Sequence, residues 1–225
     1  MSQNKTNFAV PLAFVGMMFF AIGFALGINS FLIPVLKGAL SLPSGVAYLL
    51  LAATFVPFLI FGYPASATIA KIGYKRTMAL SFLIFAVAFI LFVLSAKLEN
   101  FILFLIASFV SGAANAYLQA SVNPYITILG PIESAAKRMS IMGICNKLAW
   151  PVAPLFFALV VADQTNVQTS DLYLPFYIII GVFLLLGIIS LMAPLPEVKA
   201  AGEDESDTAN CPYAANKTSI WQFPH

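Results

Sequence analysis

Six long apolar runs constrain the fold of this 225-residue chain more than any other feature. Each run has about the 20 residues that a helix needs to cross the hydrocarbon core of a bilayer. Backbone groups in lipid must be hydrogen-bonded within the segment, and strand-like alternation is absent, so helices are expected. The expected spans are Phe8–Ile33, Ser44–Ile69, Thr77–Ser95, Phe101–Thr127, Ser140–Val161 and Leu172–Met192. The sequence predicts an all-α integral membrane protein with six transmembrane helices.

The charged residues support the membrane assignment and orient the chain. Only 9% of the residues are charged, whereas about 25% are charged in soluble domains. One expected side carries most of the lysines and arginines: Lys5, Lys71, Lys75, Arg76, Lys137, Arg138, Lys199 and Lys217. The other side has Lys37 and Lys97 alone. The positive-inside rule therefore places both termini in the cytoplasm of a multi-pass protein of the cell (inner) membrane.

The chain divides into a membrane part and a polar tail. Residues 1–195 contain all six apolar runs, and residues 196–225 have the polar, acidic composition of a disordered linker. Linkers usually join two folded parts, and apolar residues return at the end of the chain in Ile-Trp-Gln-Phe-Pro-His225. We expect a six-helix bundle followed by a cytoplasmic linker that leads toward a further membrane segment.

A short similarity between the first and fourth spans indicates an internal repeat. Asn29-Ser-Phe-Leu-Ile33 resembles Asn123-Pro-Tyr-Ile-Thr127, and each asparagine lies roughly 21 residues into its span, about 30 Å along the axis. The two spans run in opposite directions. The pattern favours two inverted three-helix repeats, as in many transporters.

Polar side chains inside the spans are the first functional candidates, because they are costly in hydrocarbon. The candidates are Asn29, Ser30, Asn115, Gln119, Asn123, Asn146, Lys147 and Trp150. The three in the fourth span are four residues apart, so they share one helix face. Amides that donate and accept, beside an aromatic ring, suit a neutral polyhydroxylated ligand. The alternative is that these amides hold helices together.

Lys147 has no acidic residue in any span to pair with. It lies about 10 Å past the start of the fifth expected span. One interpretation is that its side chain reaches the cytoplasmic surface along the helix. The other is that it faces a cavity, where it holds substrate or stands in the place of a coupling cation.

Small residues and prolines predict close and bent helices. Gly23 and Gly27 form a G-x-x-x-G pair, which allows another helix to approach closely. Prolines interrupt later spans at Pro57, Pro64, Pro124, Pro151 and Pro154.

Enzyme and channel functions are disfavoured. The one histidine is the terminal His225, so a serine or metalloprotease site in the membrane is not expected. Neither an acidic ring nor a filter loop of a cation channel is present in the sequence. We expect no cofactor, no bound metal and no nucleic-acid partner.

Two stretches resemble the major facilitator superfamily. The first, Gly62-Tyr-Pro-Ala-Ser through Lys71-Ile-Gly-Tyr-Lys-Arg76, is similar to a degenerate form of the basic loop between helices two and three of these transporters. The second, Leu118 to Arg138, resembles the helix four to five signature of the fucose–galactose–glucose symporter family. Its continuation through Met142-Gly-Ile-Cys-Asn-Lys-Leu-Ala-Trp150 is most similar to the glucose/galactose transporter branch. The similarity covers residues 8 to about 195.

The resemblance implies a fold and an activity. Members of this family have twelve helices in two six-helix halves and bind sugar between the halves. The chain would then be the N-terminal half of a hexose transporter that works by alternating access, with the C-terminal half as its partner. Two alternatives are a six-helix membrane protein that does not transport, such as a sensor or assembly subunit, and a half-transporter that dimerises.

The sequence departs from proton-coupled members that resemble fucose permease. Ser30 stands where they have an aspartate, Gln119 where they have a glutamate, and Gly143 where they have a glutamine, whereas Asn123 and Asn146 match. Loss of both carboxylates argues against proton coupling through this half. Three possibilities remain: Lys147 takes over part of the electrostatic role, sodium is the coupling ion, or coupling is lost.

The resemblance also implies a cytoplasmic latch. Its residues here are Lys71, Gly73, Lys75, Arg76, Glu133 and Arg138. Positive-inside topology explains the cations near Gly73 about equally well. The pair of Glu133 and Arg138 is assigned by the resemblance.

Overall fold

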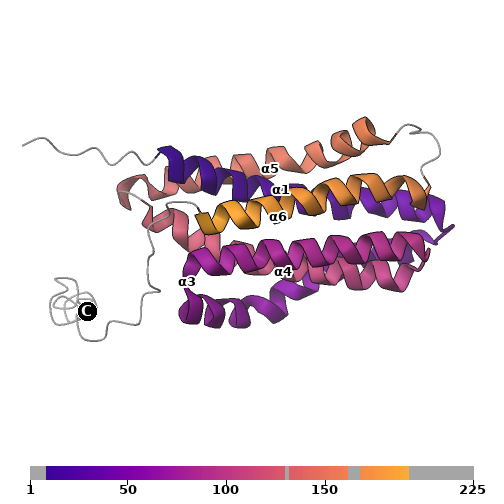
Figure 1. The fold of residues 1–225 in the computed structure, drawn as a ribbon, viewed down its shortest axis with the longest axis horizontal. Coiled ribbons are helices and arrows are strands. Elements are labelled where there is room, and N and C mark those ends of the chain that lie inside the picture. The colour runs from indigo at the N-terminus through magenta and orange to yellow at the C-terminus, as the bar shows by residue number, and fades with distance from the viewer. Residues whose placement is uncertain (1–8, 130–131, 162–167, 193–225) are drawn as a thin grey trace, which may run out of the picture.

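The computed structural model describes residues 9–129, 132–161 and 168–192, and all regular structure in these ranges is helical. The long helices are α1 (Ala9–Ala39), α3 (Leu49–Lys97), α4 (Phe101–Ile128), α5 (Ala135–Val160) and α6 (Tyr173–Met192). Short elements are α2 (Ser44–Ala47) and the 3-10 turns η1 (Ile132–Ser134) and η2 (Thr169–Leu172). All five long helices are long and apolar enough to cross a membrane. They lie roughly parallel in an elongated bundle (Figure 1).

The helix α3 covers two of the expected spans. Its 49 residues would extend about 74 Å as a straight helix, more than twice the thickness of a hydrocarbon core of about 30 Å. Gly73 interrupts it with φ 80° and ψ 168°, and the chain turns back there, so α3 is two helical segments (Figure 1). The loop expected between residues 69 and 77 is reduced to this glycine, because the flanking residues stay helical.

Two expected helix ends differ from the structure. The first helix continues six residues beyond Ile33 to Ala39, with Pro34 inside it. The fifth begins at Ala135 rather than Ser140. Proline within a long apolar helix does not end it when neighbouring groups satisfy the freed backbone carbonyl. The expected linker at residues 196–225 lies outside the described residues.

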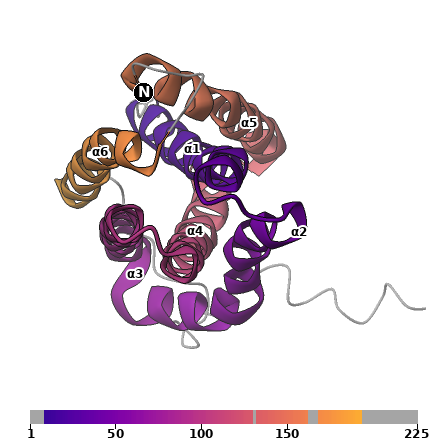
Figure 2. The ribbon, with the colours of Figure 1, turned by 90° about the vertical axis from the view of Figure 1, so that its right-hand side faces the viewer.

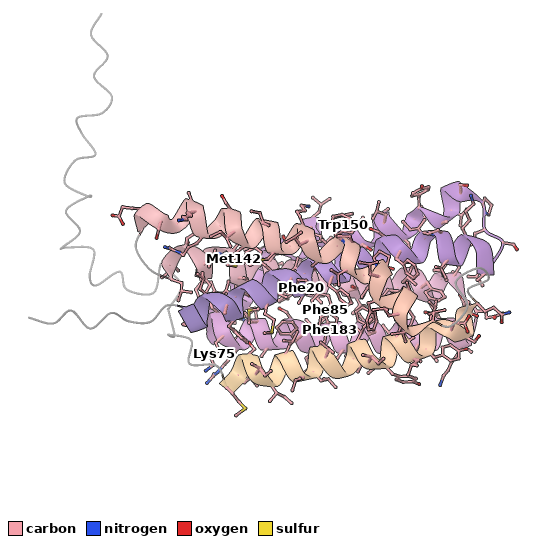
Figure 3. The ribbon with its side chains drawn as sticks, turned by 90° about the horizontal axis from the view of Figure 1, so that it is seen from above. Phe20, Lys75, Phe85, Met142, Trp150 and Phe183 are labelled. Atoms are coloured by element: carbon pink, nitrogen blue, oxygen red, sulfur yellow. The ribbon has the colours of Figure 1, made fainter. Side chains whose placement is uncertain are left out.

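Aromatic rings fill the contact between the second segment of α3 and α6. Phe85 and Phe183 stack with their ring centroids 4.7 Å apart (Figure 3). The rings of Phe92 and Phe176 stack with their centroids 5.4 Å apart. All four side chains are buried. Each such pair adds about 0.5–1.5 kcal/mol to the burial of its rings. This contact fixes α6 beside α3.

Glycines allow the closest approach between helices. A Cβ atom added at Gly23 would lie 1.9 Å from the backbone oxygen of Asn146, and one at Gly27 would lie 2.5 Å from that of Trp150. The expected role of the G-x-x-x-G pair is therefore confirmed, and its partner is α5. Gly112 of α4 meets the Thr54 backbone of α3 in the same way, at 2.1 Å. Seen along the bundle, α4 lies between α1 and α3 (Figure 2).

We expect Gly73→Ala to lower the free energy of unfolding by about 1–3 kcal/mol, because the φ and ψ angles of Gly73 are strained for a residue with a Cβ atom. The neighbouring Gly62→Ala is the control, since Gly62 lies in a helix with open space at its Cβ position. The measurement is the thermal unfolding midpoint of the full-length protein in detergent. Equal midpoints for the two variants would show that the turn in α3 does not depend on glycine.

Candidate functional site

The middle of α5 carries an exposed cation. Lys147 is the thirteenth of the 26 residues of α5, so it lies about 18–20 Å from either end of the helix. Its Nζ atom lies 5.0 Å from the centroid of the Trp150 ring, within cation–π distance. Trp150 is half-buried. A lysine at the centre of a span costs about 2.5–3.5 kcal/mol when the span is inserted into lipid. This face of α5 is therefore poorly suited to hydrocarbon.

The amides of α4 differ in exposure along their shared face. Asn115 is fully buried, whereas Gln119 and Asn123 are half-buried, one and two turns further along the helix. Neither the amide nitrogen nor the amide oxygen of Asn115 has a hydrogen-bond partner among the described residues. In this conformation Asn115 does not join helices through a hydrogen bond. The two accessible amides lie toward the C-terminal end of α4.

The polar residues of α1 have different surroundings although they are neighbours in sequence. Asn29 is buried, and its Nδ2 donates to the Ala25 carbonyl at 3.1 Å and to Ser111 Oγ of α4 at 3.3 Å. Ser30 is half-buried, and its hydroxyl donates to the Leu26 carbonyl at 3.1 Å. Asn29 thus links α1 to α4, which is the helix-holding alternative for that residue. Its partner Ser111 is not among the sequence candidates, although it lies four residues before Asn115 on the same face.

Asn146 joins α5 to α1. Its Nδ2 donates to the Phe19 carbonyl at 3.1 Å, next to the close contact between Gly23 and the Asn146 backbone. The side chain is half-buried. The amide nitrogen therefore has a structural role in this conformation.

The structure separates the eight candidates into two groups. Side chains with some exposure are Ser30, Gln119, Asn123, Asn146, Lys147 and Trp150. The fully buried ones are Asn29 and Asn115. Neutral hydrogen-bonding groups, one cation and an aromatic face are thus available on α1, α4 and α5. Within the described part of the chain no three His, Cys, Asp or Glu side chains come together as metal ligands.

Arg138 lies at the junction of α4 and α5 and is buried. Its Nε donates to the Ile126 carbonyl at 3.2 Å, its Nη2 donates to the Thr127 carbonyl at 3.1 Å, and its Nη1 donates to Ser134 Oγ. Carbonyls in the last turn of a helix lack partners within the helix, so the guanidinium caps α4. This role is not indicated by the sequence, where the resemblance assigns Arg138 to the cytoplasmic latch together with Glu133.

The other residues of the expected latch lie near two turns of the chain. Lys71 and Arg76 are exposed and Lys75 is half-buried, on either side of Gly73. Glu133 is exposed in the turn η1. Figure 3 places Lys75 at the end of the bundle where α1 begins and α6 ends.

Comparison with known proteins places these features in a family. The sequence profile of the Major Facilitator Superfamily matches residues 14–223. A glucose/galactose transporter of Brucella abortus is 30% identical over 229 residues, covering 100% of this chain and 54% of that protein. The L-fucose-proton symporter of Escherichia coli is 22% identical over 242 residues, covering 99% of this chain and 55% of the symporter. The chain spans about half the length of the curated relatives that it matches.

A solved structure shares the fold. The Major Facilitator Superfamily transporter FucP in the outward conformation superposes with a TM-score of 0.71 and 23% sequence identity. The match covers 85% of this chain and 51% of FucP. At this identity the likeness concerns the fold.

Proposed function

This chain belongs to the Major Facilitator Superfamily, and from this premise we propose that it is the N-terminal half of a secondary active transporter for a hexose-type sugar. The similar proteins are named as transporters and symporters, in agreement with the expectation that the chain is not an enzyme. Sugar is proposed as the substrate because a glucose/galactose transporter and a fucose symporter are among them. The second half of the cavity would come from the C-terminal part of the same transporter.

The proposed topology has six crossings in two inverted repeats. Counting α3 as two crossings gives three helices before Asn100 and three after it: α1 and the two segments of α3, then α4, α5 and α6. The turn at Gly73 supports this count. Both termini would lie in the cytoplasm, with residues 1–195 as the bundle and residues 196–225 as the linker to the second half. The cations around Gly73, together with Glu133 and Arg138, would form the cytoplasmic latch.

The observation that carries the proposal is the exposed Lys147 beside Trp150 at the middle of α5. A cation there needs water or another polar wall, and a cavity between two halves supplies both. The Trp150 ring offers a flat face for the C–H groups of a sugar ring. Gln119 and Asn123 offer amides that both donate to and accept from hydroxyls. Ser30 and Asn146 would add polar groups, and buried Asn29 and Asn115 would enter the site only if the helices move.

Proton coupling through this half is not part of the proposal. The helices α1, α3, α4, α5 and α6 contain neither aspartate nor glutamate. A proton carrier in the membrane normally requires such a group or a histidine. Coupling through the second half, coupling to sodium, and uncoupled transport remain the alternatives, and transport assays with a proton or sodium gradient distinguish them.

The test of the sugar assignment is counterflow of labelled sugar into proteoliposomes that contain the full-length protein. We expect flux of at least one of glucose, galactose, mannose and fucose. A folded protein that moves none of the four would overturn the sugar assignment and favour a non-transporting membrane protein. Flux from the 225-residue chain alone, appearing together with a dimer, would favour the half-transporter.

Replacing Gln119 or Asn123 with alanine is expected to weaken sugar binding without unfolding the protein. Each lost hydrogen bond to a neutral sugar is worth about 0.5–1.5 kcal/mol, which corresponds to a rise in Kd of about 2-fold to 12-fold. The control is Ser95→Ala, because Ser95 is buried and its hydroxyl donates to the Phe92 carbonyl of its own helix. Sugar titration and the thermal midpoint are measured for all three variants. Unchanged affinity in both amide variants would assign these side chains to helix packing.

A further inference from the structure

The helices α1, α5 and α6 surround an apolar groove of about 260 Å³. Its walls come from residues between Met17 and Phe24 of α1, from Phe156 of α5, and from residues between Ile178 and Leu186 of α6. Every lining side chain is aliphatic, aromatic or methionine. Phe20 and Phe183, both in the lining, lie near the middle of the bundle's length (Figure 3). Since the lining side chains are all apolar, the groove suits a hydrocarbon occupant.

The groove opens away from the polar face of α5. Phe156, which lines it, is nine residues from Lys147, and nine residues turn a helix by about 900°, which places the two side chains on opposite sides. Met17, Phe20 and Val182 at its edges are exposed. If the face of Lys147 is covered by the second half of the protein, the groove faces the lipid.

Positive charges lie at one end of the helices that form the groove. Lys71, Lys75 and Arg76 flank Gly73, and Lys75 lies at the end of the bundle where α6 terminates (Figure 3). Val182, at the centre of the α6 wall, is ten residues from Met192, the last residue of that helix, which is about 15 Å. Half of a hydrocarbon core has about the same thickness. An acyl chain whose headgroup lies at the basic end would reach the centre of the groove.

We propose that this groove binds an acyl chain of an anionic phospholipid, with the headgroup held by the cations around Gly73. The apolar lining selects hydrocarbon, and the basic end selects a negative headgroup, since cations near the membrane surface attract anionic lipids. The lipid would fill the gap between α5 and α6 and bind α1 as well. This site is separate from the proposed sugar cavity, although its cations are those proposed for the cytoplasmic latch, and it depends on the membrane topology rather than on the substrate.

The test uses the full-length protein in nanodiscs that contain phosphatidylglycerol with a photoactivatable diazirine at the middle of one acyl chain. After illumination, mass spectrometry of peptides should find adducts concentrated in the segments Met17–Phe24 and Ile178–Leu186. Val182→Trp fills the groove and should lower this labelling several-fold. Val87→Trp is the matched control, because Val87 on α3 is 47% exposed and Val182 is 48% exposed. The control should leave the labelling of the groove unchanged.

The headgroup is tested by a second comparison. Phosphatidylcholine with the same diazirine should label the groove less than phosphatidylglycerol does, and Lys75→Gln with Arg76→Gln should remove the difference. Equal labelling of the two lipids would overturn the headgroup assignment. Adducts spread evenly over exposed helix faces, or labelling that Val182→Trp leaves unchanged, would overturn the site. Because the photolabelling experiment contains no sugar, its outcome does not depend on whether the protein transports sugar.

Discussion

Replacing Gly23 with alanine is expected to destabilise the protein strongly, because it forces α1 away from α5. The new Cβ would lie 1.9 Å from the Asn146 backbone oxygen and 3.1 Å from the Ala149 Cβ. The first neighbour is main chain in the middle of a helix, so it cannot turn aside as a flexible side chain would. Overpacking of a well-packed interior costs about 1–3 kcal/mol, and a contact with backbone belongs at the upper end of this range. The Asn146 to Phe19 hydrogen bond, which crosses the same contact, would weaken with it.

The matched control for Gly23→Ala is Gly143→Ala. Gly143 lies in α5 with open space around its Cβ position. Alanine is favoured over glycine in a helix by about 0.8–1 kcal/mol, so Gly143→Ala should be neutral or slightly stabilising. The measurement is the fraction of full-length protein that stays monodisperse after heating in detergent. A Gly23→Ala protein as heat-resistant as the Gly143→Ala protein would contradict the close contact between α1 and α5.

The helices are predictable from the sequence because their signal is local. Long apolar runs without strand-like alternation form helices where the solvent is lipid. Gly23 and Gly27, four residues apart, indicate that another helix packs closely against α1. Helix ends are less predictable, since Pro34 would end a helix in water and does not end α1. The cations Lys71, Lys75 and Arg76 mark the position of the turn near Gly73, but nothing in the sequence shows that the expected loop is reduced to one glycine.

The accessible part of the candidate site is not predictable from the sequence, because exposure depends on helix rotation and on neighbours. Asn29 and Ser30 are adjacent, yet one is buried against Ser111 and the other is half-buried. Asn115 and Gln119 share a face of α4, and Asn115 alone is fully buried, one turn from the contact between Gly112 and Thr54. Periodicity identifies the polar stripe, and only packing between helices decides which part a ligand can reach.

Arg138→Ala should destabilise the junction of α4 and α5 by about 3 kcal/mol or more. The substitution removes a charged donor from two backbone carbonyls, those of Ile126 and Thr127, and hydrogen bonds to charged groups are worth about 1.5–3 kcal/mol each. It also removes a positive charge from the C-terminal end of α4, where the helix dipole favours cations. The control is Lys137→Ala, because the neighbouring Lys137 is exposed. This variant should change the free energy of unfolding by less than about 0.5 kcal/mol, as judged from its thermal unfolding midpoint.

Arg138→Lys separates the role of the charge from that of the cap. Lysine keeps the cation but lacks the planar fork that donates to two carbonyls at once, so it should recover only part of the lost stability. Asn123 lies within one turn before these carbonyls in α4. Lys147 and Trp150 lie on α5, whose first turn contains Arg138 and is held against the end of α4 by it. Loss of the cap should therefore weaken sugar binding along with stability. Both should be lowest with alanine at position 138, intermediate with lysine and highest with the original arginine. If Arg138 acts only in the latch, Arg138→Ala would change the transport rate while the thermal midpoint and the sugar affinity stay unchanged.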